Sequence, residues 1–235
     1  MKQSVEEAIN DIREGKMVFV YDFDERERET DMTIASEFVT PEVIREMRKN
    51  AGGLICTTAH NDIVEALDLP FLADIFNCAS KDHPVLNRLT PNDLPYDTKS
   101  AFGVTINHRK TFTGITDIDR AMTISEFAKF VKNVDHKRPE DLREEFGHHF
   151  RAPGHVHLLN ASKNLLTKRF GHTELTTALM VMAGVVPSAM ICEMMGDDGR
   201  ALSKDKAKDY AKEKGLCFLE GKQVIEAWAR WGRER

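Results

Sequence analysis

Short apolar runs alternate with amphipathic stretches along almost the whole chain, and this alternation limits the folds open to it more than any other feature. Runs typical of strands occupy residues 17–21, 54–57, 102–106, 156–159, 189–193 and 216–219. Strands that alternate with helices predict an α/β fold built around a sheet. The chain has no internal repeat and no sharp change of composition, so we expect a single domain over residues 1–235.

Capping residues predict where helices begin and end. The expected helices run from a Ser4-x-x-Glu7 capping box to Gly15, from Thr40-Pro41 to Gly52-Gly53, from a Thr123-x-x-Glu126 capping box through Val131, over residues 174–183, from Ser203 onwards, and over residues 224–231. Residues 68–99 contain Pro and Asn without periodicity, which predicts a long loop able to cover a site. Residues 135–145 are polar, and we expect them to form a surface excursion.

Composition argues against several classes of protein. Charged residues make up 30% of the chain but nearly balance, with a formal net charge of -5, so nucleic acid is not an expected partner. No apolar run approaches the roughly 20 residues of a membrane span, and the first residues lack the apolar core of a signal peptide. We therefore expect no membrane contact and a cytoplasmic location. Cys56, Cys192 and Cys217 lie in apolar runs and predict buried thiols.

The densest charge of the chain follows the first predicted strand. Residues 22–31 hold six carboxylates and two guanidiniums. Carboxylates this close resist ionising together unless a cation, either Arg or a bound metal, lies among them. An EF-hand is excluded, because its calcium loop needs Gly at the sixth position, where this chain has Glu27. The segment on its own is equally typical of a solvated acidic loop.

Three further groups carry possible chemistry. Arg169 and the free N–H groups of a helix capped by Thr173 would bind phosphate, and His172 between them could ligate a metal, although a capping Thr beside a partly exposed His is the commoner meaning of this pattern. His155 precedes a strand and could simply pack. Glu193 ends an apolar strand and is either a surface group or a base whose pKa its apolar neighbours raise.

In this order, the segments resemble the signature of the 3,4-dihydroxy-2-butanone-4-phosphate synthase family. That signature combines D-x-[DE]-[DE]-R-E-x-E-x-D, T-G-x-[ST]-x-x-D-R, R-x-P-G-H, R-x-G-H-T-E and C-E. The matching residues here are 22–31, 113–120, 151–155, 169–174 and 192–193. Five motifs in register are highly specific. The form of the acidic loop is similar to that of archaeal, monofunctional members, and the resemblance implies one α+β domain with a mixed, twisted sheet layered with helices.

The resemblance also implies roles for individual residues. Glu27 and His172 would be the protein ligands of Mg²⁺ or Mn²⁺, with two ions present once substrate is bound. His155, Glu193 and Asp31 would carry out the acid–base steps. Arg26 and Asp31 would contact the sugar, and Arg169 and Thr173 its phosphate. The full set of implied substrate contacts is Asp22, Arg26, Asp31, Cys56, Arg169, Thr173, Glu174 and Glu193.

The activity implied by the resemblance converts D-ribulose 5-phosphate to L-3,4-dihydroxy-2-butanone 4-phosphate and formate, a step of riboflavin biosynthesis. The reaction begins with removal of a proton next to a carbonyl, so negative charge develops on oxygen and a divalent metal stabilises it. Glu193 or Asp31 would take the proton, and His155 would pass it on. The resemblance further implies a homodimer with its sites at the subunit interface.

Two other classes of function deserve comparison. A related fold binds nucleotides and acts in tRNA modification, but such a protein should have a basic surface, whereas this chain is acidic. A metal-storage or regulatory domain would bind the ion without turnover. Formate release from ribulose 5-phosphate separates the enzyme from both alternatives.

Overall fold

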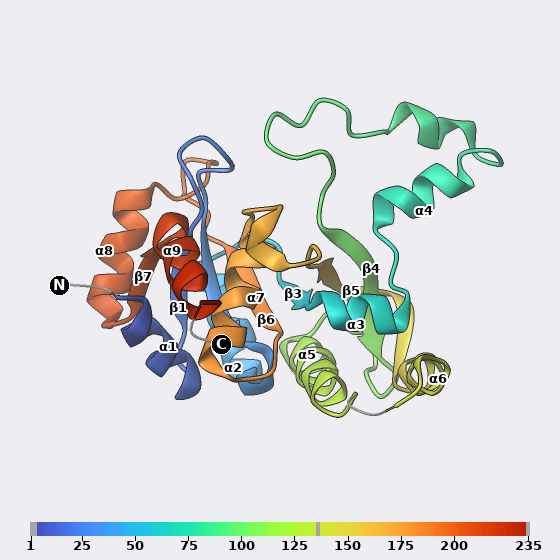
Figure 1. Ribbon diagram of the computed structural model, residues 1–235, viewed down its shortest axis with the longest axis horizontal. Helices are drawn as coiled ribbons and strands as arrows, with labels where there is room; N and C mark the ends of the chain where they lie inside the picture. Colours follow the sequence, from blue (N-terminus) through green and yellow to red (C-terminus); the bar gives the residue numbers. More distant parts are fainter. Residues whose placement is uncertain (1–3, 135–136, 234–235) are drawn as a thin grey trace.

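In the computed structural model, which describes residues 4–134 and 137–233, seven strands form one mixed sheet (Figure 1). The strands are β1 (Val18–Tyr21), β2 (Thr30–Ala35), β3 (Cys56–Ala59), β4 (Phe102–His108), β5 (Phe150–Asn160), β6 (Ala189–Glu193) and β7 (Cys217–Glu220). Their order across the sheet is β4-β5-β3-β6-β2-β1-β7. β1 pairs with β7 and β3 with β5 in parallel, and the other neighbours are antiparallel. The mixed sheet implied by the resemblance is confirmed.

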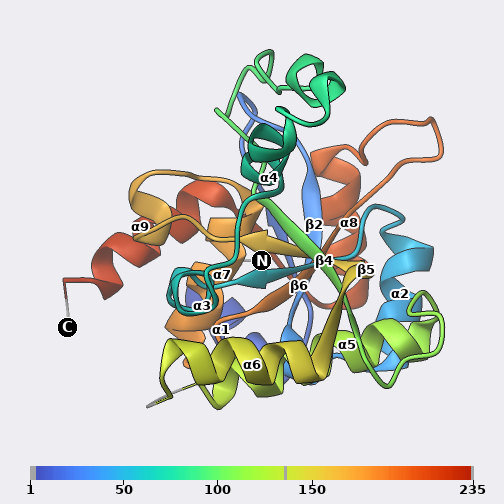
Figure 2. The same ribbon diagram turned by 90° about the vertical axis from the view of Figure 1, so that its right-hand side faces the viewer.

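Helices cover both faces of this sheet, as Figures 1 and 2 show. They are α1 (Val5–Arg13), α2 (Pro41–Asn50), α3 (Asn61–Leu67), α4 (Leu72–Ala79), α5 (Asp117–Lys132), α6 (Pro139–His149), α7 (His172–Ala183), α8 (Lys204–Lys214) and α9 (Gly221–Trp231), with 3-10 turns η1 (Ser36–Phe38), η2 (Pro84–Arg88) and η3 (Leu165–Thr167). None of the helices in the described part of the chain has the length and apolar character needed to cross a bilayer.

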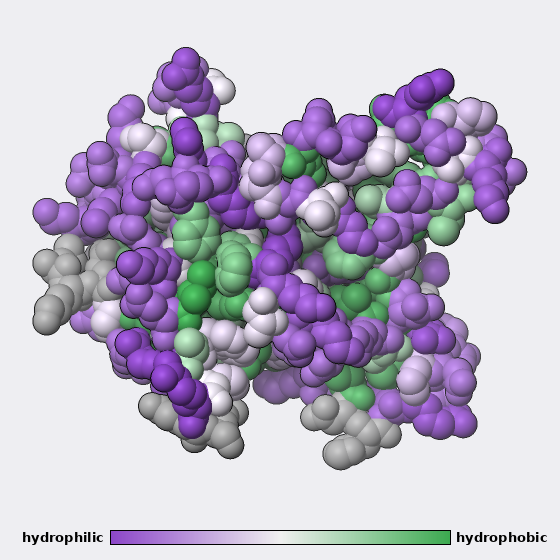
Figure 3. Space-filling view, turned by 45° about the horizontal axis from the view of Figure 1, so that its top comes forward, coloured by the Kyte–Doolittle hydropathy of each residue, from purple (hydrophilic) through white to green (hydrophobic). Residues whose placement is uncertain are grey.

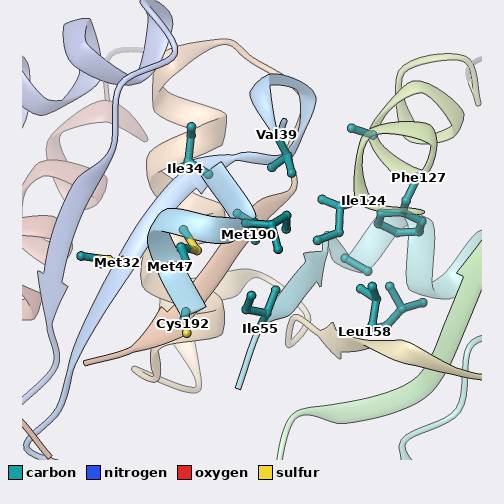
Figure 4. Packing of buried hydrophobic residues seen from close by; sticks show 14 of the residues in the cluster. Met32, Ile34, Val39, Met47, Ile55, Ile124, Phe127, Leu158, Met190 and Cys192 are labelled. Carbon is teal, nitrogen blue, oxygen red and sulfur yellow. The ribbon is translucent and has the colours of Figure 1, made fainter. Parts of the chain in front are cut away.

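Alternation along the strands creates two apolar cores, one on each face of the sheet. In β1, Phe19 and Tyr21 belong to the core covered by α2, α5 and α8, whereas Val18 and Val20 belong to the core covered by α1, α7 and α9. Figure 4 shows part of the first core, in which Met47 of α2 belongs to one apolar cluster with Ile34 of β2 and Met190 of β6. The helices are therefore held to the sheet by burial of their apolar faces.

Several boundaries predicted from capping residues agree with the structure. Ser4 and Glu7 form the expected capping box at α1, and Thr40 caps α2 with Pro41 as its first residue. β6 covers the predicted residues 189–193. The third strand begins at Cys56 rather than at residue 54, because the N–H of Leu54 binds the Glu193 carboxylate at 2.7 Å instead of a neighbouring strand.

The capping box predicted at Thr123 is wrong. Helix α5 begins at Asp117, where the Thr116 side chain accepts the N–H of Asp119 at 3.1 Å. Thr123 lies inside the helix, and its hydroxyl donates to the carbonyl oxygen of Asp119 at 2.9 Å. A hydroxyl that can bond the preceding turn does not by itself identify a helix start.

Two segments predicted as irregular contain helices. The loop expected over residues 68–99 includes α4 and the turn η2, and it forms the arm that projects at the upper right of Figure 1. The excursion expected over 135–145 includes most of α6, while residues 135 and 136 lie outside the described part of the chain. α4 has no buried residue and α6 buries only Leu142. Helices that bury so little need no long apolar periodicity, which is the pattern that identifies buried helices in a sequence.

Strand β2 was not predicted at all. Its first two residues, Thr30 and Asp31, are polar and yet buried, because the strand lies between β1 and β6. This insertion carries the end of the acidic loop into the middle of the sheet.

Candidate functional site

A cavity of about 290 Å³ opens beside the ends of two central strands, where β2 begins, β6 ends and α7 starts. Its polar lining comes from the acidic loop, from the first turn of α7 and from the end of β6. Tyr96 and Ser100, from the segment ahead of β4, complete the wall. The face of the molecule shown in Figure 3 is largely hydrophilic, with smaller apolar patches between the hydrophilic side chains.

Antiparallel pairing of β2 with β6 places two carboxylates opposite each other. Asp31 and Glu193 are register partners, so their side chains leave the sheet on the same face. Burial raises the pKa of Asp31 well above its usual value, and the charge of Glu193 adds to the rise. One oxygen of Asp31, Oδ1, is buried without a hydrogen-bond partner among the described residues. A ligand that offers a cation or a donor there would satisfy it.

The acidic loop folds around a buried carboxylate. Asp22, at the end of β1, accepts the backbone N–H groups of Glu27 at 2.9 Å and of Glu29 at 3.1 Å. Arg28 adopts a left-handed conformation with φ of 61°, which turns the chain back toward β2. The loop therefore directs the Glu27 side chain toward the start of α7, where its Oε2 atom accepts a hydrogen bond from His172.

His172 joins this loop to α7 across 145 residues of sequence. Its Nδ1 lies 3.1 Å from Glu27 Oε2 and its Nε2 lies 3.2 Å from the Glu29 carbonyl oxygen. Both partners are acceptors, so both ring nitrogens carry protons. Burial alone would lower the pKa of His172, but the carboxylates of Asp31, Glu27 and Asp22 outweigh burial and raise it to about 10.

The same groups fit a divalent metal. Ligand atoms of Asp22, Glu27 and His172 all lie within 4.8 Å of one another. Burial opposes ionisation of Glu27, but His172 and Arg26 overcome that effect and lower its pKa to about 2. Glu27 is therefore an anion ready to bind a cation, and a carboxylate with an imidazole is a common ligand pair for divalent ions.

A cationic side chain, Arg169, lines the same cavity next to these carboxylates. Arg169 donates from Nη1 to the buried Glu174 at 2.6 Å, and from Nε and Nη2 to Asp97 at 3.1 and 2.8 Å. The N–H groups of His172 and Thr173 lie in the first turn of α7 and have no acceptor within the helix. A guanidinium next to a helix N-terminus favours an anionic ligand.

Comparison with known proteins connects this geometry to a family. The sequence model described as 3,4-dihydroxy-2-butanone 4-phosphate synthase matches residues 6–227. The chain belongs to that family.

Two archaeal relatives named 3,4-dihydroxy-2-butanone 4-phosphate synthase support the assignment. The protein of Methanothermobacter thermautotrophicus is 49% identical, over 95% of this chain and 95% of its own length. That of Methanosarcina mazei is 44% identical, over 97% and 92%. The archaeal branch indicated by the acidic loop thus includes close relatives of this chain.

Solved structures of the synthase family have the same fold. A 3,4-dihydroxy-2-butanone 4-phosphate synthase in complex with two magnesium ions superposes with a TM-score of 0.73 at 28% identity, over 96% of each chain. The synthase of Candida albicans gives a TM-score of 0.71 at 28% identity, over 95% of this chain and 96% of its own.

In this member of the synthase family, the structure brings most of the expected site residues to one cavity. Those that line it are Glu27, Asp31, Arg169, His172, Thr173 and Glu193. Arg26 does not line the cavity but contacts one of its residues, since Arg26 Nη1 donates to Glu27 Oε2 at 2.7 Å. Glu174 is fully buried and holds Arg169 rather than facing the cavity.

Two residues expected to contact substrate are buried and do not line the cavity. The side chain of Asp22 is fully buried, and both of its oxygens accept hydrogen bonds from the acidic loop. Cys56 is 1% exposed in β3, and burial followed by the charges of Glu193 and Asp31 raises its pKa well above the usual value. Its thiol is therefore protonated and shielded at neutral pH.

His155 lies apart from this cavity. It is exposed on β5, where its N–H donates to Asn107 Oδ1 at 2.8 Å and its Nδ1 accepts from Asn107 Nδ2 at 3.1 Å. It is not among the residues that line the cavity. Within one chain, the expected acid–base histidine and Glu193 therefore do not share the cavity.

The structure corrects the predicted cap of α7 and reveals one site residue that the sequence did not indicate. Gly171, and not Thr173, occupies the N-cap of α7, so Thr173 presents its N–H from within the first turn. Asp97 was not predicted, although it binds both Arg26 and Arg169. No local pattern identifies Asp97, because its role depends on two arginines distant in sequence.

Proposed function

We propose that this chain converts D-ribulose 5-phosphate to L-3,4-dihydroxy-2-butanone 4-phosphate and formate, using Mg²⁺ or Mn²⁺, in riboflavin biosynthesis. Membership of the synthase family supports the reaction. The observation that carries the proposal is the meeting of Glu27 and His172 at 3.1 Å on the wall of a cavity that also holds Arg169.

The cavity has separate surfaces for the two ends of the substrate. Arg169 and the free N–H groups at Thr173 bind the phosphate, because they are the cationic and donor groups of the lining. Arg26 and Asp31 contact the sugar hydroxyls and carbonyl. An open-chain ketose phosphate can therefore lie with its carbonyl end beside Glu27 and its phosphate beside α7.

Proton transfer belongs to the pair of facing carboxylates. Asp31 and Glu193 lie opposite each other on β2 and β6, and burial raises the pKa of Asp31 well above its usual value. One of the pair removes the proton next to the carbonyl. The thiol of Cys56 is protonated and adds no charge.

Glu27 and His172 would hold the metal, with two ions present when substrate is bound. One of the solved synthase structures is itself a complex with two magnesium ions. A bound divalent ion supplies Lewis-acid stabilisation of the negative charge that develops on substrate oxygen. Asp22 keeps the acidic loop folded so that Glu27 faces the ion.

A second copy of the chain completes the site. His155 is exposed and lies outside the cavity of its own chain, and the motif around it binds a loop with bulky exposed apolar side chains. Arg151 Nη2 donates to the Phe112 carbonyl oxygen at 3.2 Å, and Phe112 and Ile118 are 92% and 64% exposed. Apolar side chains this exposed are typical of interfaces. We infer a homodimer in which His155 reaches the partner's cavity.

A cytoplasmic location and a single domain stay predictions.

The reaction is tested by formate release. The purified protein with ribulose 5-phosphate and Mg²⁺ should release formate in step with substrate loss, and EDTA should stop the reaction. Absence of formate with metal present would refute the proposed activity.

The metal ligands are tested by Glu27→Gln and His172→Ala. Each substitution should lower kcat at least about 100-fold, because a site that has lost one of its protein ligands binds the metal ion weakly. The thermal melting curves of the metal-free variants should remain cooperative. The matched control is Glu25→Gln, which removes an exposed carboxylate from the same loop and should leave turnover unchanged. A variant at Glu27 or His172 with wild-type turnover would remove that residue from the metal site.

A further inference from the structure

The Asp97 carboxylate lies where two guanidinium groups meet. Arg26 Nη2 donates to Asp97 Oδ2 at 2.5 Å, and Arg169 donates to the same oxygen from Nε at 3.1 Å and from Nη2 at 2.8 Å. The three side chains are only 7%, 13% and 18% exposed for Arg26, Asp97 and Arg169, so water shields these charges little. A single oxygen that accepts three N–H groups from two guanidiniums makes the contacts of a phosphate oxygen.

Arg169 is fixed from the opposite side by a different carboxylate. Glu174 is fully buried, its Oε1 accepts the N–H of Ser162 at 3.0 Å, and its Oε2 accepts Arg169 Nη1 at 2.6 Å. This anchoring directs the Nε and Nη2 edge of Arg169 toward Asp97. That edge is the one with which arginine binds a carboxylate or a phosphate through two parallel bonds, and Asp97 occupies both of its donors.

Asp97 belongs to a segment without regular structure. Residues 89–101 connect η2 to β4 and contain neither helix nor strand, and in Figure 1 they lead back from the projecting arm to the sheet. A hollow of about 360 Å³ beside Asp97 is lined by Arg169 and by two further cations, Lys99 and Lys168. Segments of this kind open at a low free-energy cost, and the hollow leaves room for an anion next to Asp97 and Arg169.

We propose that Asp97 is a built-in competitor of the substrate phosphate and thereby a specificity-determining residue. Without substrate it neutralises Arg26 and Arg169, and a phosphate ester displaces it. This inference rests on the phosphate site of the proposed function. A phosphate ester carries a charge close to -2 at neutral pH and offers three acceptor oxygens, so it replaces both bonds that Asp97 gives up at Arg169 and leaves Arg26 free to contact the sugar. A neutral sugar replaces none of the charge-assisted bonds and leaves Asp97 in place.

Competition lowers the apparent affinity for phosphate by the fraction of molecules in which Asp97 has left the arginines. Removing the competing charge should therefore tighten phosphate binding. If Asp97 instead only positions the two guanidiniums, removing it should weaken the binding, so the two roles predict opposite signs.

The test is calorimetric titration of inorganic phosphate into the full-length protein with Mg²⁺ present. Asp97→Asn, which keeps the shape of the side chain, and Asp97→Ala should each bind phosphate about tenfold more tightly than the wild type, and KM for ribulose 5-phosphate should fall in parallel. The matched control is Asp93→Asn, which removes one exposed carboxylate from the same segment and should leave the affinity unchanged. Unchanged or weaker phosphate binding in both Asp97 variants would overturn the proposal.

A further variant separates this inference from the phosphate site itself. Arg169→Ala should weaken phosphate binding about 100-fold, because it removes the bidentate donor. If it does, and the Asp97 variants bind no more tightly, only the competitor role is wrong. If Arg169→Ala leaves phosphate affinity unchanged, the phosphate site is misplaced and the inference falls with it.

Discussion

At the scale of single residues, His172 shows how surrounding charge can reverse the effect of burial. Burial disfavours an imidazolium, yet Asp31, Glu27 and Asp22 raise the pKa of His172 to about 10. Because this value lies above the ordinary 6.5, the imidazolium stabilises the metal-free fold fully below about pH 6.5, and the stabilisation is lost as the pH rises through about 10. A metal ion must displace that proton to bind the ring.

Magnesium binding should therefore release about one proton at pH 7.5, and the affinity should rise up to about tenfold per pH unit between pH 6.5 and 10. Glu27 contributes no proton in this window, because its pKa is lowered to about 2. Calorimetry in two buffers of different ionisation enthalpy measures the proton count. His148→Ala, which removes an exposed histidine on α6, should leave the count unchanged. Binding with no proton release at pH 7.5 would contradict the charged state assigned to His172.

At the scale of elements, the pairing of β4 with β5 decides where His155 is displayed. The register of this pair shifts between Ile106 and Asn107, and a Cβ atom at Gly154 would lie 1.9 Å from the backbone carbon of Ile106. Only glycine allows the two backbones to approach so closely. The approach also lets Asn107 bind both the N–H and the ring of His155.

Gly154→Ala should consequently lower the free energy of unfolding by about 2–4 kcal/mol, because the strands must separate to admit the methyl group. Chemical denaturation of the metal-free protein measures the change. Gly147→Ala is the matched control: a Cβ at Gly147, inside α6, meets nothing within 4 Å, so this substitution should stabilise the protein by about 0.5–1 kcal/mol. Equal stability of the two variants would show that β4 and β5 are not packed this closely.

At the scale of the whole molecule, the distribution of acid–base groups argues for a shared site. Glu193 lines the cavity, whereas His155 is exposed on β5 and does not. A symmetric dimer can bring each histidine to the partner's cavity through one self-complementary face. The exposed Phe112 and Ile118 supply apolar area for such a face.

Mixed dimers test this arrangement. His155→Ala and Glu27→Gln should each be inactive alone, yet their co-expression should restore about a quarter of wild-type formate release, because half of the dimers are mixed and each has one intact site. Co-expression of Glu27→Gln with His172→Ala is the control and should restore nothing, since in a mixed dimer each chain then lacks one residue of its own Glu27–His172 pair. If the first pair also stays inactive, His155 does not act across the interface.

Local patterns predicted the elements whose character depends on near neighbours. The apolar run 189–193 became β6, and the capping boxes or caps at Ser4 and Thr40 started α1 and α2. Strand β2 escaped prediction because its polar residues Thr30 and Asp31 are buried by pairing with β1 and β6, which no local pattern reports. Helices α4 and α6 escaped because they bury little apolar surface.

The sequence by itself determined which residue types would meet: an acidic loop after the first strand, an R-x-G-H-T-E helix start and a C-E strand end. Their order and spacing indicated the family before any coordinates. Only the tertiary structure decided how they meet. Insertion of β2 beside β6 set Asp31 opposite Glu193. Contact between the acidic loop and α7 raised the pKa of His172. The segment leading to β4 placed Asp97 between two arginines. Caps and periodicity depend on residues within a turn or two, whereas pKa values and ion pairs depend on groups that only folding brings together.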